Sequence, residues 1–559
     1  MKRNLAAFLA VAMMVSVLSG CASSEPAATE AAATEAVVAA TQAATQAAAA
    51  EAAPAAEAKP DTWLCDEKTT LTILTYDGVN NSFTPPSNDL PFWKYLEDRT
   101  NVHIDWEIVP YSGYPEVIAA RLAAATDLPD IVVTTDYQVN NNAGKNGVFA
   151  DLNAKWDLFP NTEKYFSDQG QNYRASLKNE DGTFYAIAGS VQPVEGHICF
   201  HYNTEWMKKL GKEVPKTLDE FTELLEAMKA AGDLNGNGEA DEVIFTANGV
   251  NGIGSALGSA FGLNSYESWD QFSVDANGVV FPEYTSENQK AYISYLNDLY
   301  NKGLLDPEIS SMTADMVSEK CAADKVGVFV YYSAFAITYG KLTSKGVEDP
   351  NGEWYTIGGP LASKWNNNKG YYMRREVIQE VPTSISADSQ NIDLACKWLD
   401  VLFADPEVLK VRTCGFEGED YEYDANGNFQ LIMPADGSAW SINTKGCGQI
   451  VLAYNQTKEQ LLNSKRQYQW YMDEYDALRE NTEWKAPVIP RVIAYSDSEQ
   501  EKIDDCRTDV LDYFKEMRDK FVTGEASIEK DWDTYCQNID KLGLPTLTEV
   551  WQSVYDRTR

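Results

Sequence analysis

The residues between 233 and 242 form the most specific group in the sequence that could do chemistry. Asp233, Asn235 and Asn237 place oxygen-bearing side chains at alternate positions, and a glycine follows at the sixth position of the run. This pattern is typical of the first half of a calcium loop, because calcium takes about six to eight oxygen ligands and the glycine permits a tight turn. An EF-hand would be closed by a glutamate at its twelfth position, which is Ile244 here, so the acidic closure must come from the Asp-Glu pair that ends the run. A solvated Asn-Gly turn is the alternative interpretation.

A helix and a strand are expected to hold this loop. Thr217 is a suitable N-cap residue, and Glu220 follows at the capping-box spacing of a helix start. The helix is expected to end near Ala231, and the apolar run 243–245 predicts the strand that follows. We expect a second lobe of the protein to begin with this helix.

Histidines and cofactor motifs give weaker signals. The histidines are His103, His197 and His201, of which the last two have an H-x-x-x-H spacing that suits zinc on a helix. Their β-branched and aromatic neighbours favour a strand, where residues four apart lie about 13 Å from each other, too far for one ion. The run 252–258 misses the dinucleotide-binding spacing by one residue, and neither a nucleophile elbow nor a P-loop occurs. Paired carboxylates for glycoside hydrolysis stay open, because 84 acidic residues offer any separation.

Length and charge limit the class of protein. The chain has 559 residues, of which 44% are hydrophobic, so two or more folded units are expected. It carries 46 basic and 84 acidic residues, a net charge of -38. This charge repels a phosphate backbone, so we expect no nucleic-acid partner.

The amino-terminal segment predicts export and membrane attachment. Residues 1–21 have a basic start, an apolar run and the ending Leu-Ser-Gly-Cys, which resembles the lipobox of bacterial lipoproteins. Cys21 would then carry lipid (palmitate), whereas an ordinary cleaved signal with an incidental cysteine is the alternative. Residues 22–60 are rich in alanine and have no aromatic side chain to bury, so they are interpreted as a disordered tether. The folded body is expected to span residues 61–559.

The cysteines of this body are scattered. No CxxC or CxxH spacing occurs, so a zinc site built from cysteines is not expected. Because an exported chain can form disulfides, the sequence leaves open whether any of them pair. They are Cys65, Cys199, Cys321, Cys396, Cys414, Cys447, Cys506 and Cys536.

Hydrophobic periodicity predicts an α/β protein. The run 70–75 alternates as a strand, residues 92–96 have helical spacing, and 102–108 alternate again, which makes a β-α-β unit. A further helix over 116–125 and a short strand near 131–133 extend this unit into a mainly parallel sheet. Longer amphipathic stretches at 289–302, 392–403 and 502–521 make the later half richer in helix.

Several phrases in fixed order resemble the extracellular solute-binding family of ABC importers, in particular its larger lipoprotein branch that is similar to alginate-oligosaccharide binders. The resemblance covers most of residues 68–556. The phrases are Leu128-Pro129-Asp130-Ile131, Tyr202-Asn203-x-x-Trp206, Lys209-Leu210-Gly211, 214–221 (VPKTLDEF), 302–308 (KGLLDPE), Phe521-Val522-Thr523-Gly524 and Gln552-x-x-Tyr555-Asp556-Arg557.

The resemblance implies a two-lobed α/β fold of the periplasmic-binding-protein kind (type II), with a hinge between the lobes and a ligand cleft at their interface. The expected lobes are discontinuous: 66–195 with 325–390, and 200–324 with 391–559. It also implies a structural calcium ion in the shortened loop. The implied ligands are the side chains of Asp233, Asn235, Asn237, Asp241 and Glu242 and the carbonyl oxygen of Glu239.

Sugar binding calls for flat aromatic side chains against the ring and planar polar groups around it. Aromatic residues in polar loops or at strand ends are the candidates, because those on apolar helix faces, such as Trp398, are expected in the core. Either Arg374 or Arg375 could bind hydroxyl groups or a uronate carboxylate. The ligand-binding candidates are Tyr76, Trp93, Trp269, Tyr331, Tyr332, Trp354 and Arg374.

These observations predict a calcium-stabilised binding protein rather than an enzyme. It would be anchored by lipid on the outer face of the cell membrane, capture an oligosaccharide by hinge closure as a monomer, and deliver it to an ABC permease. Another small organic solute could be the ligand. Two other functions stay open: a sensor lipoprotein with the same fold, and a secreted carbohydrate-active enzyme.

Overall fold

The computed structural model describes most of the chain beyond residue 59. The described residues are 60–77, 85–168, 172–191, 198–264, 271–373, 378, 381–435, 440–449, 451–456, 462–485, 489–490 and 492–558. The predicted signal peptide, the lipidation site Cys21 and the tether over 22–60 lie outside them, except for Pro60. A search of the described helices for one that is long and apolar enough to span a bilayer finds none.

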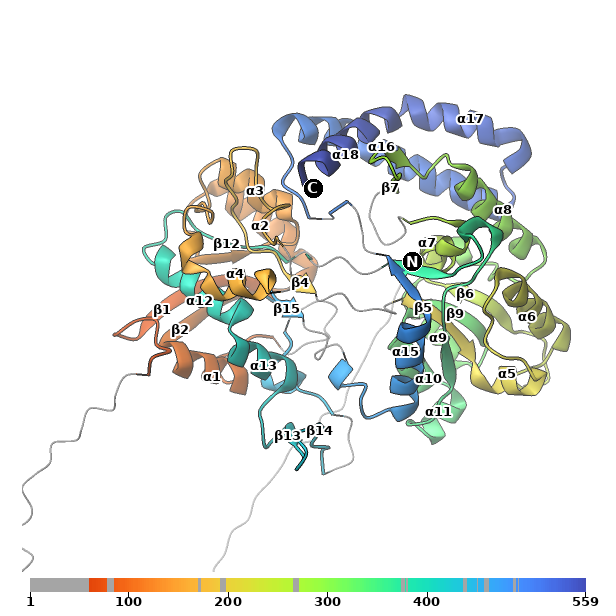
Figure 1. Ribbon diagram of the computed structural model, residues 1–559, viewed down its shortest axis with the longest axis horizontal. Coiled ribbons are helices and arrows are strands. Elements are labelled where there is room, and N and C mark those ends of the chain that lie inside the picture. Colours follow the sequence, from red (N-terminus) through yellow and green to blue (C-terminus); the bar gives the residue numbers. More distant parts are fainter. Residues whose placement is uncertain are drawn as a thin grey trace, which may run out of the picture. The chain divides into compact units, whose positions relative to one another are not determined.

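The first sheet has four strands in the order β12-β3-β1-β2 (Figure 1). Strand β1 is parallel to β2 and β3, and β12 joins antiparallel to β3. Helix α1 begins with a proline in its first turn and ends at Asn101, which adopts the left-handed conformation (φ 58°) that asparagine tolerates. The predicted β-α-β unit is therefore confirmed. The elements are β1 (Thr69–Tyr76), α1 (Pro91–Thr100), β2 (Val102–Val109), α2 (Tyr114–Ala124), β3 (Ile131–Val133) and β12 (Thr383–Ile385).

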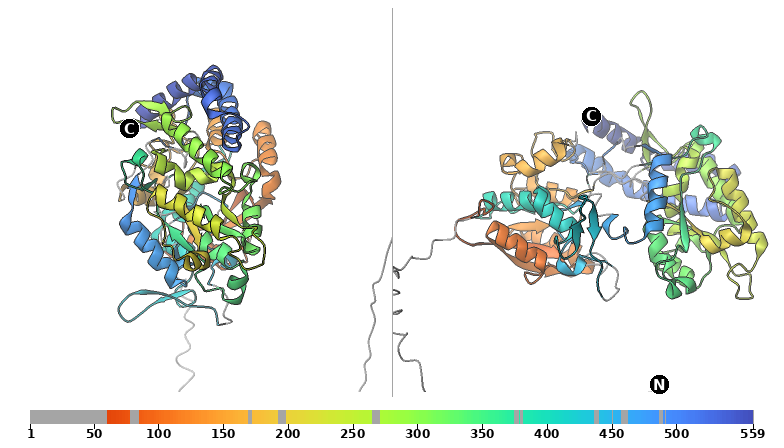
Figure 2. Two further views of the ribbon diagram at one scale, coloured as in Figure 1. Left: turned by 90° about the vertical axis from the view of Figure 1, so that its right-hand side faces the viewer. Right: turned by 60° about the horizontal axis from the view of Figure 1, so that its bottom comes forward.

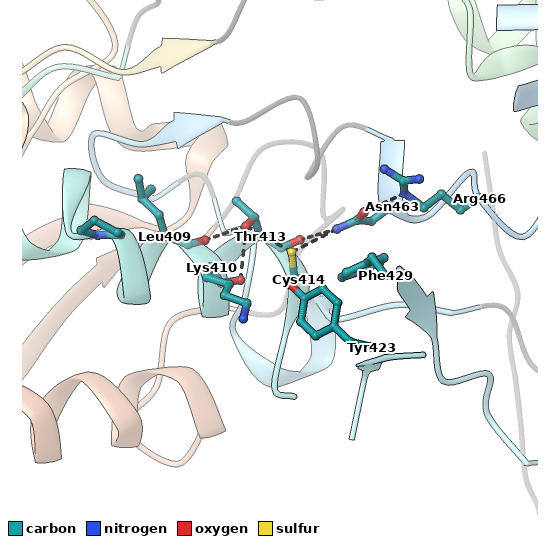
Figure 3. Close-up of a pocket in the computed structure, with 9 residues that line it drawn as sticks. Leu409, Lys410, Thr413, Cys414, Tyr423, Phe429, Asn463 and Arg466 are labelled. Carbon is teal, nitrogen blue, oxygen red and sulfur yellow. Dashed lines mark hydrogen bonds between the residues drawn. The ribbon is translucent and has the colours of Figure 1, made fainter. Parts of the chain in front are cut away.

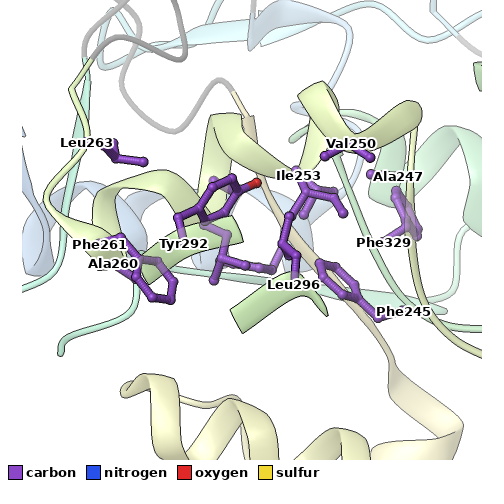
Figure 4. Close-up of a cluster of buried hydrophobic side chains, with 14 of the residues drawn as sticks. Phe245, Ala247, Val250, Ile253, Ala260, Phe261, Leu263, Tyr292, Leu296 and Phe329 are labelled. Carbon is purple, nitrogen blue, oxygen red and sulfur yellow. The ribbon is translucent and has the colours of Figure 1, made fainter. Parts of the chain in front are cut away.

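The second sheet has the order β10-β5-β9-β6. Strand β5 runs antiparallel to β9 and β10, whereas β6 is parallel to β9. Helix α7 packs against β5, β6 and β9, and its apolar side chains meet those of the sheet and of α8 in the buried cluster of Figure 4. The elements are β5 (Ile198–Asn203), α5 (Thr204–Leu210), α6 (Leu218–Ala231), β6 (Val243–Ala247), α7 (Gly249–Leu257), α8 (Glu287–Asn301), α9 (Ala314–Ala322), β9 (Val326–Tyr332), α10 (Phe335–Gly340) and β10 (Tyr355–Gly358).

The carboxyl-terminal helices belong with the second sheet. Helix α16 (Asp497–Thr523) packs against α8, α17 (Ile528–Lys541) and α18 (Leu544–Thr558), and the views of Figures 1 and 2 agree on this grouping. Helix α15 (Gln469–Asn481) contacts β10. The remaining elements are α3 (Tyr137–Lys145), α4 (Pro160–Ser167), β4 (Ser190–Val191), β7 (Phe272–Val274), β8 (Val280–Pro282), α11 (Ser344–Glu348), β11 (Tyr371–Met373), α12 (Ile392–Ala404), α13 (Pro406–Cys414), β13 (Tyr421–Tyr423), β14 (Phe429–Leu431), β15 (Asn455–Gln456) and β16 (Glu483–Lys485).

Two separate hydrophobic cores show the two-lobed α/β architecture. The first core collects buried residues from 71–188 and 385–453, together with Val492 and Ala494. The second collects them from 199–372 and 462–555. The chain therefore passes between the two cores several times.

The structure divides the chain differently from the predicted lobes. Strands β9 and β10 were expected in the first lobe, but their ladder with β5 and β6 places them in the second. Helices α12 and α13 were expected in the second lobe, but they pack against α4 and α1 of the first. The physical reason is that alternation and helical spacing identify an element without saying which sheet it joins.

Candidate functional site

The predicted calcium loop follows α6 and leads into β6, as its flanking signals indicated. The capping box of α6 is present, with the Thr217 hydroxyl and the Glu220 carboxylate each bonded to the other residue's backbone. Asp233 accepts hydrogen bonds from the backbone of Gly236 (2.7 Å) and Gly238 (2.9 Å), which closes the first half of the loop. The helix and the strand therefore fix both ends of a tightly wound turn.

The acidic pair at the end of the run folds back on the loop. Glu242 accepts hydrogen bonds from the backbone of Leu234 (2.5 Å) and Asn235 (3.3 Å). One carboxylate oxygen of Asp241 faces the amide of Asn237 (3.1 Å), and the other pairs with Lys325 (2.6 Å). Hydrogen bonds from Lys325 and Asn237 hold the pKa of Asp241 below its usual range.

The loop supplies oxygen-bearing side chains of the kind that calcium requires. One carboxylate oxygen of Asp241 is paired with the Lys325 ammonium, so a calcium ion would have to displace this positive charge. The described residues contain no group of three or more His, Cys, Asp or Glu side chains gathered as metal ligands. A calcium ion would therefore need the amide oxygens of Asn235 and Asn237, turned inward in place of their nitrogens, as well as the carboxylates.

The described histidines lie apart, one on each of the two four-stranded sheets. His103 on β2 bonds to Glu97 (2.7 Å). His201 on β5 is completely buried and stacks on Phe329 with ring centroids 4.2 Å apart, and its burial lowers its pKa to about 4. His201 is therefore a neutral core residue, and His197 lies outside the described residues.

Two of the predicted ligand-binding aromatic residues lie in the first core instead. Tyr76 is 1% exposed and makes edge-to-face contacts with Tyr111 and Tyr114. Trp93 is 3% exposed, and its indole nitrogen donates to the side chain of Gln449 (2.8 Å). Neither ring offers a face to a ligand in this structure. Contacts with residues farther along the chain bury both side chains, and the sequence does not reveal these contacts.

Other predicted ligand-binding residues keep an accessible position. Tyr332, at the end of β9, is 37% exposed, and half-buried Tyr331 packs beside it with ring centroids 5.1 Å apart. Trp354 is half-buried and donates to the carbonyl of Asp349 (2.8 Å). Trp269, Arg374 and the alternative Arg375 lie outside the described residues.

The strand pairings show which strand ends lie next to the segments that connect the two lobes. The chain leaves the first lobe after β4 and enters the second at Ile198, which pairs directly with Tyr332. It returns before Thr383, which pairs with Val133 at the carboxyl end of β3. Ligands of α/β sheets bind beyond the carboxyl ends of strands, so the ends of β3 and β9 are the candidate ligand-binding edges.

Comparison with known proteins decides the family. The model of the bacterial extracellular solute-binding protein family matches residues 85–408, more than half of the chain. The chain belongs to this family. The family resemblance inferred from the sequence motifs is thereby confirmed.

This solute-binding protein is similar to curated relatives over more than half of its length. It is 26% identical to the fructooligosaccharide ABC transporter substrate-binding protein FusA of Streptococcus pneumoniae, over 89% of the chain and 92% of FusA. It is also 26% identical to the lipoprotein LipO of Bacillus subtilis, over 60% of the chain and 65% of LipO.

Solved structures share its fold. The alginate-binding protein AlgQ2, solved without calcium ion, aligns with a TM-score of 0.67 and 20% identity, over 89% of this chain and 100% of AlgQ2. FusA in complex with kestose aligns with a TM-score of 0.66 and 23% identity, over 87% of this chain and 99% of FusA. These likenesses support the two-lobed α/β fold of the solute-binding protein.

A carboxyl pair that the sequence did not reveal lies between α15 and β10 of this solute-binding protein. Glu474 accepts hydrogen bonds from the hydroxyl of Thr356 and the backbone of Ile357 (3.1 Å). Burial, together with the neighbouring Glu353, raises the pKa of Glu474 to about 7. The two glutamates are more than a hundred residues apart in sequence, so no motif could have signalled them.

The cysteines of the folded body are not paired. All eight are free thiols among the described residues, and six of them are buried. Burial raises the pKa of Cys396 and Cys447 to about 12, so these thiols stay protonated and unreactive at neutral pH.

Proposed function

We propose that this protein is the oligosaccharide-binding subunit of an ABC importer. The observation that carries the proposal is the alignment with FusA, which is named as a fructooligosaccharide-binding protein and matches nearly end to end. A relative named as a polygalacturonan/rhamnogalacturonan-binding protein, YtcQ of Bacillus subtilis, is 24% identical over 42% of the chain. The ligand would be released to a permease in the membrane.

Capture would depend on motion between two rigid lobes and not on bond chemistry. Each lobe has its own hydrophobic core. A ligand that contacts both lobes favours the closed arrangement because it gains contacts there that the open one lacks. Tyr331 and Tyr332, at the end of β9, would contact a sugar ring, and the partial exposure of both supports this role.

Attachment to the membrane would depend on Cys21. Its place after Leu-Ser-Gly at the end of an apolar run supports lipidation, and the relative LipO is named as a lipoprotein. The alanine-rich segment that follows would act as a tether on the outer face of the membrane.

Calcium would stabilise the loop over 233–242. The geometry of Asp241 and Glu242 supports this role, and so do two structural relatives, FusA described as an EF-hand mutant and AlgQ2 described as lacking calcium ion. The ion would neutralise carboxylates that otherwise repel one another in one short loop.

Thermal unfolding against a panel of oligosaccharides tests the proposed function. Residues 60–559 form one compact unit and provide the sample. A ligand at 100 times its dissociation constant adds about 2.7 kcal/mol to the free energy of unfolding, which raises the unfolding midpoint. A rise with one class of sugar, with the sugar recovered unchanged, is the expected result. Release of reducing ends would identify an enzyme, and no rise with any sugar would overturn the proposal.

A further inference from the structure

A cavity of about 350 Å³ lies outside the sites described above. It is formed by α13, the hairpin of β13 and β14, and the segment 463–466, and Figure 3 shows these three parts around Thr413 and Cys414. Its volume is at the lower end for small-molecule sites, which suits one sugar unit rather than a long chain. The lining residues are Pro406, Leu409, Lys410, Thr413, Cys414, Tyr423, Phe429, Asn463 and Arg466.

Aromatic rings form one wall of this cavity. Tyr423, on β13 of the hairpin, is 45% exposed. Phe429, on the neighbouring strand β14, is half-buried. Pro406 and Leu409 add apolar surface from α13. Flat aromatic and apolar surfaces of this kind match the C–H face of a sugar ring.

A guanidinium group with unused donors lies at the same cavity. Arg466 is centred 5.7 Å from the Phe429 ring, and its Nε donates to the side chain of Asn463 (3.1 Å). Neither terminal nitrogen of Arg466 bonds to a residue that the structure describes. Two parallel N–H donors in one plane are suited to bind both oxygens of a carboxylate.

Two basic side chains, Lys410 and Arg466, line the cavity of a chain whose net charge is -38. The Lys410 ammonium lies 5.1 Å from the centre of the Tyr423 ring and forms an ion pair with Glu417 (3.2 Å). Arg412, on the same helix, is 3% exposed and donates to the carbonyl of Gln449 (3.0 Å). Arg412 donates to backbone carbonyls and does not line the cavity, whereas Arg466 lines it and has no carboxylate partner within the described part of the chain, so an anion bound beside Arg466 would be favoured.

We propose that this cavity binds a carboxylated sugar unit, a uronate, of the oligosaccharide. Arg466 binds the carboxylate, and Tyr423 packs against the ring, while Phe429 stacks on Tyr421 and lies beneath the Arg466 guanidinium. The inference rests on the proposed function and deepens it, because it assigns an acidic class of oligosaccharide to the protein.

Binding of matched acidic and neutral ligands tests this assignment. Trisaccharides of galacturonate, mannuronate or glucuronate, and their carboxyl-reduced counterparts, are titrated calorimetrically into residues 22–559. At least one acidic trisaccharide should bind about 10-fold or more tightly than its reduced counterpart. Arg466→Gln should remove this preference, a loss of about 10- to 100-fold, because a charge-assisted bidentate contact disappears. Arg121→Gln removes the same charge from a surface pair with Glu107 and should leave the preference unchanged.

A second variant separates ring contacts from charge. Tyr423→Ser should weaken the acidic trisaccharide and its reduced form by a similar factor, because both present the same C–H face. Neutral oligosaccharides that bind without any acidic preference would overturn the uronate assignment and leave the proposed function standing. Equal losses for both ligand forms in Arg466→Gln would also overturn it. If no oligosaccharide of either kind binds, the proposed function fails together with the inference.

Discussion

At the residue scale, Glu474 makes stability depend on pH. Its pKa is raised to about 7 in the folded protein, whereas in the unfolded chain it returns to about 4.3. The folded state therefore binds the extra proton between these values, and stability falls as pH rises through this window. We expect the free energy of unfolding to fall by about 1–3 kcal/mol across this window. Glu474→Gln, which mimics the protonated form, should reduce this fall.

Urea unfolding at several pH values between 4.5 and 8 measures this dependence. Asp473→Asn is the matched control, because Asp473 is an exposed neighbour on the same helix. Its pH profile should follow that of the unchanged protein. A Glu474→Gln profile as steep as the original would contradict the assigned role of this carboxyl group.

Tyr332, at the end of β9 in the second sheet, is 37% exposed. Tyr332→Ala should weaken oligosaccharide binding by about 10-fold, because the ring loses its contact with the sugar face. Phe281→Ala is the control, since Phe281 is equally exposed, at 37%, on the separate β7–β8 hairpin. Isothermal titration compares the two variants. Equal affinities would show that the ligand does not contact β9.

At the scale of elements, the loop between α6 and β6 should respond to calcium. Calcium at 100 times its dissociation constant should raise the free energy of unfolding by about 2.7 kcal/mol, and a chelator should reverse the rise. Asp233→Asn should abolish most of the response, because Asp233 supplies a carboxylate at the first position of the loop. Differential scanning calorimetry with and without calcium gives the measurement.

The hairpin turn between β7 and β8 provides the control for this experiment. Asp275 there accepts backbone hydrogen bonds from Asn277 and Val279 (both 2.8 Å), much as Asp233 does in its own loop. Asp275→Asn therefore removes a similar turn carboxylate where no calcium is expected. A calcium response that is lost in Asp275→Asn and kept in Asp233→Asn would place the ion elsewhere.

The elements that the sequence predicted well are those with local signals. The capping box at Thr217 and Glu220, the alternation of β1 and β2, and the oxygen spacing of the loop each depend on residues within about ten positions. The roles of Tyr76 and Trp93 were not predictable in this way. Trp93 is buried and donates a hydrogen bond to Gln449, more than 350 residues away in the sequence. A partner so distant produces no pattern in the sequence around Trp93.

At the scale of the whole molecule, the net charge of -38 opposes folding through self-repulsion. Raising sodium chloride from about 0.01 to 0.3 M shortens the screening length severalfold and should increase the free energy of unfolding. Urea unfolding in the presence of a chelator measures this effect without a contribution from calcium. A decrease in stability with salt would mean that surface ion pairs, such as Arg99 with Asp405 and Glu407, outweigh the repulsion.

The lobe boundaries could not be predicted for a related reason. The sequence shows that β9 and α12 exist, but sheet membership depends on pairing partners that are far away in the chain. The family resemblance supplied the two-lobed fold, and only the structure shows which segments fill each lobe.

The alternation of the chain between two cores also governs the order in which the protein can fold during export. A chain that emerges amino end first presents residues 71–188 early, but their core also needs 385–453, Val492 and Ala494. The first lobe is therefore incomplete until nearly 500 residues have crossed the membrane, while 199–372 must wait for the helices beyond 462. Folding that depends on contacts between residues so far apart in the chain is slow, and apolar surface stays exposed until these contacts form. The protein is expected to need binding by chaperones outside the membrane, and truncation at any point between residues 199 and 453 should leave neither lobe with a complete core.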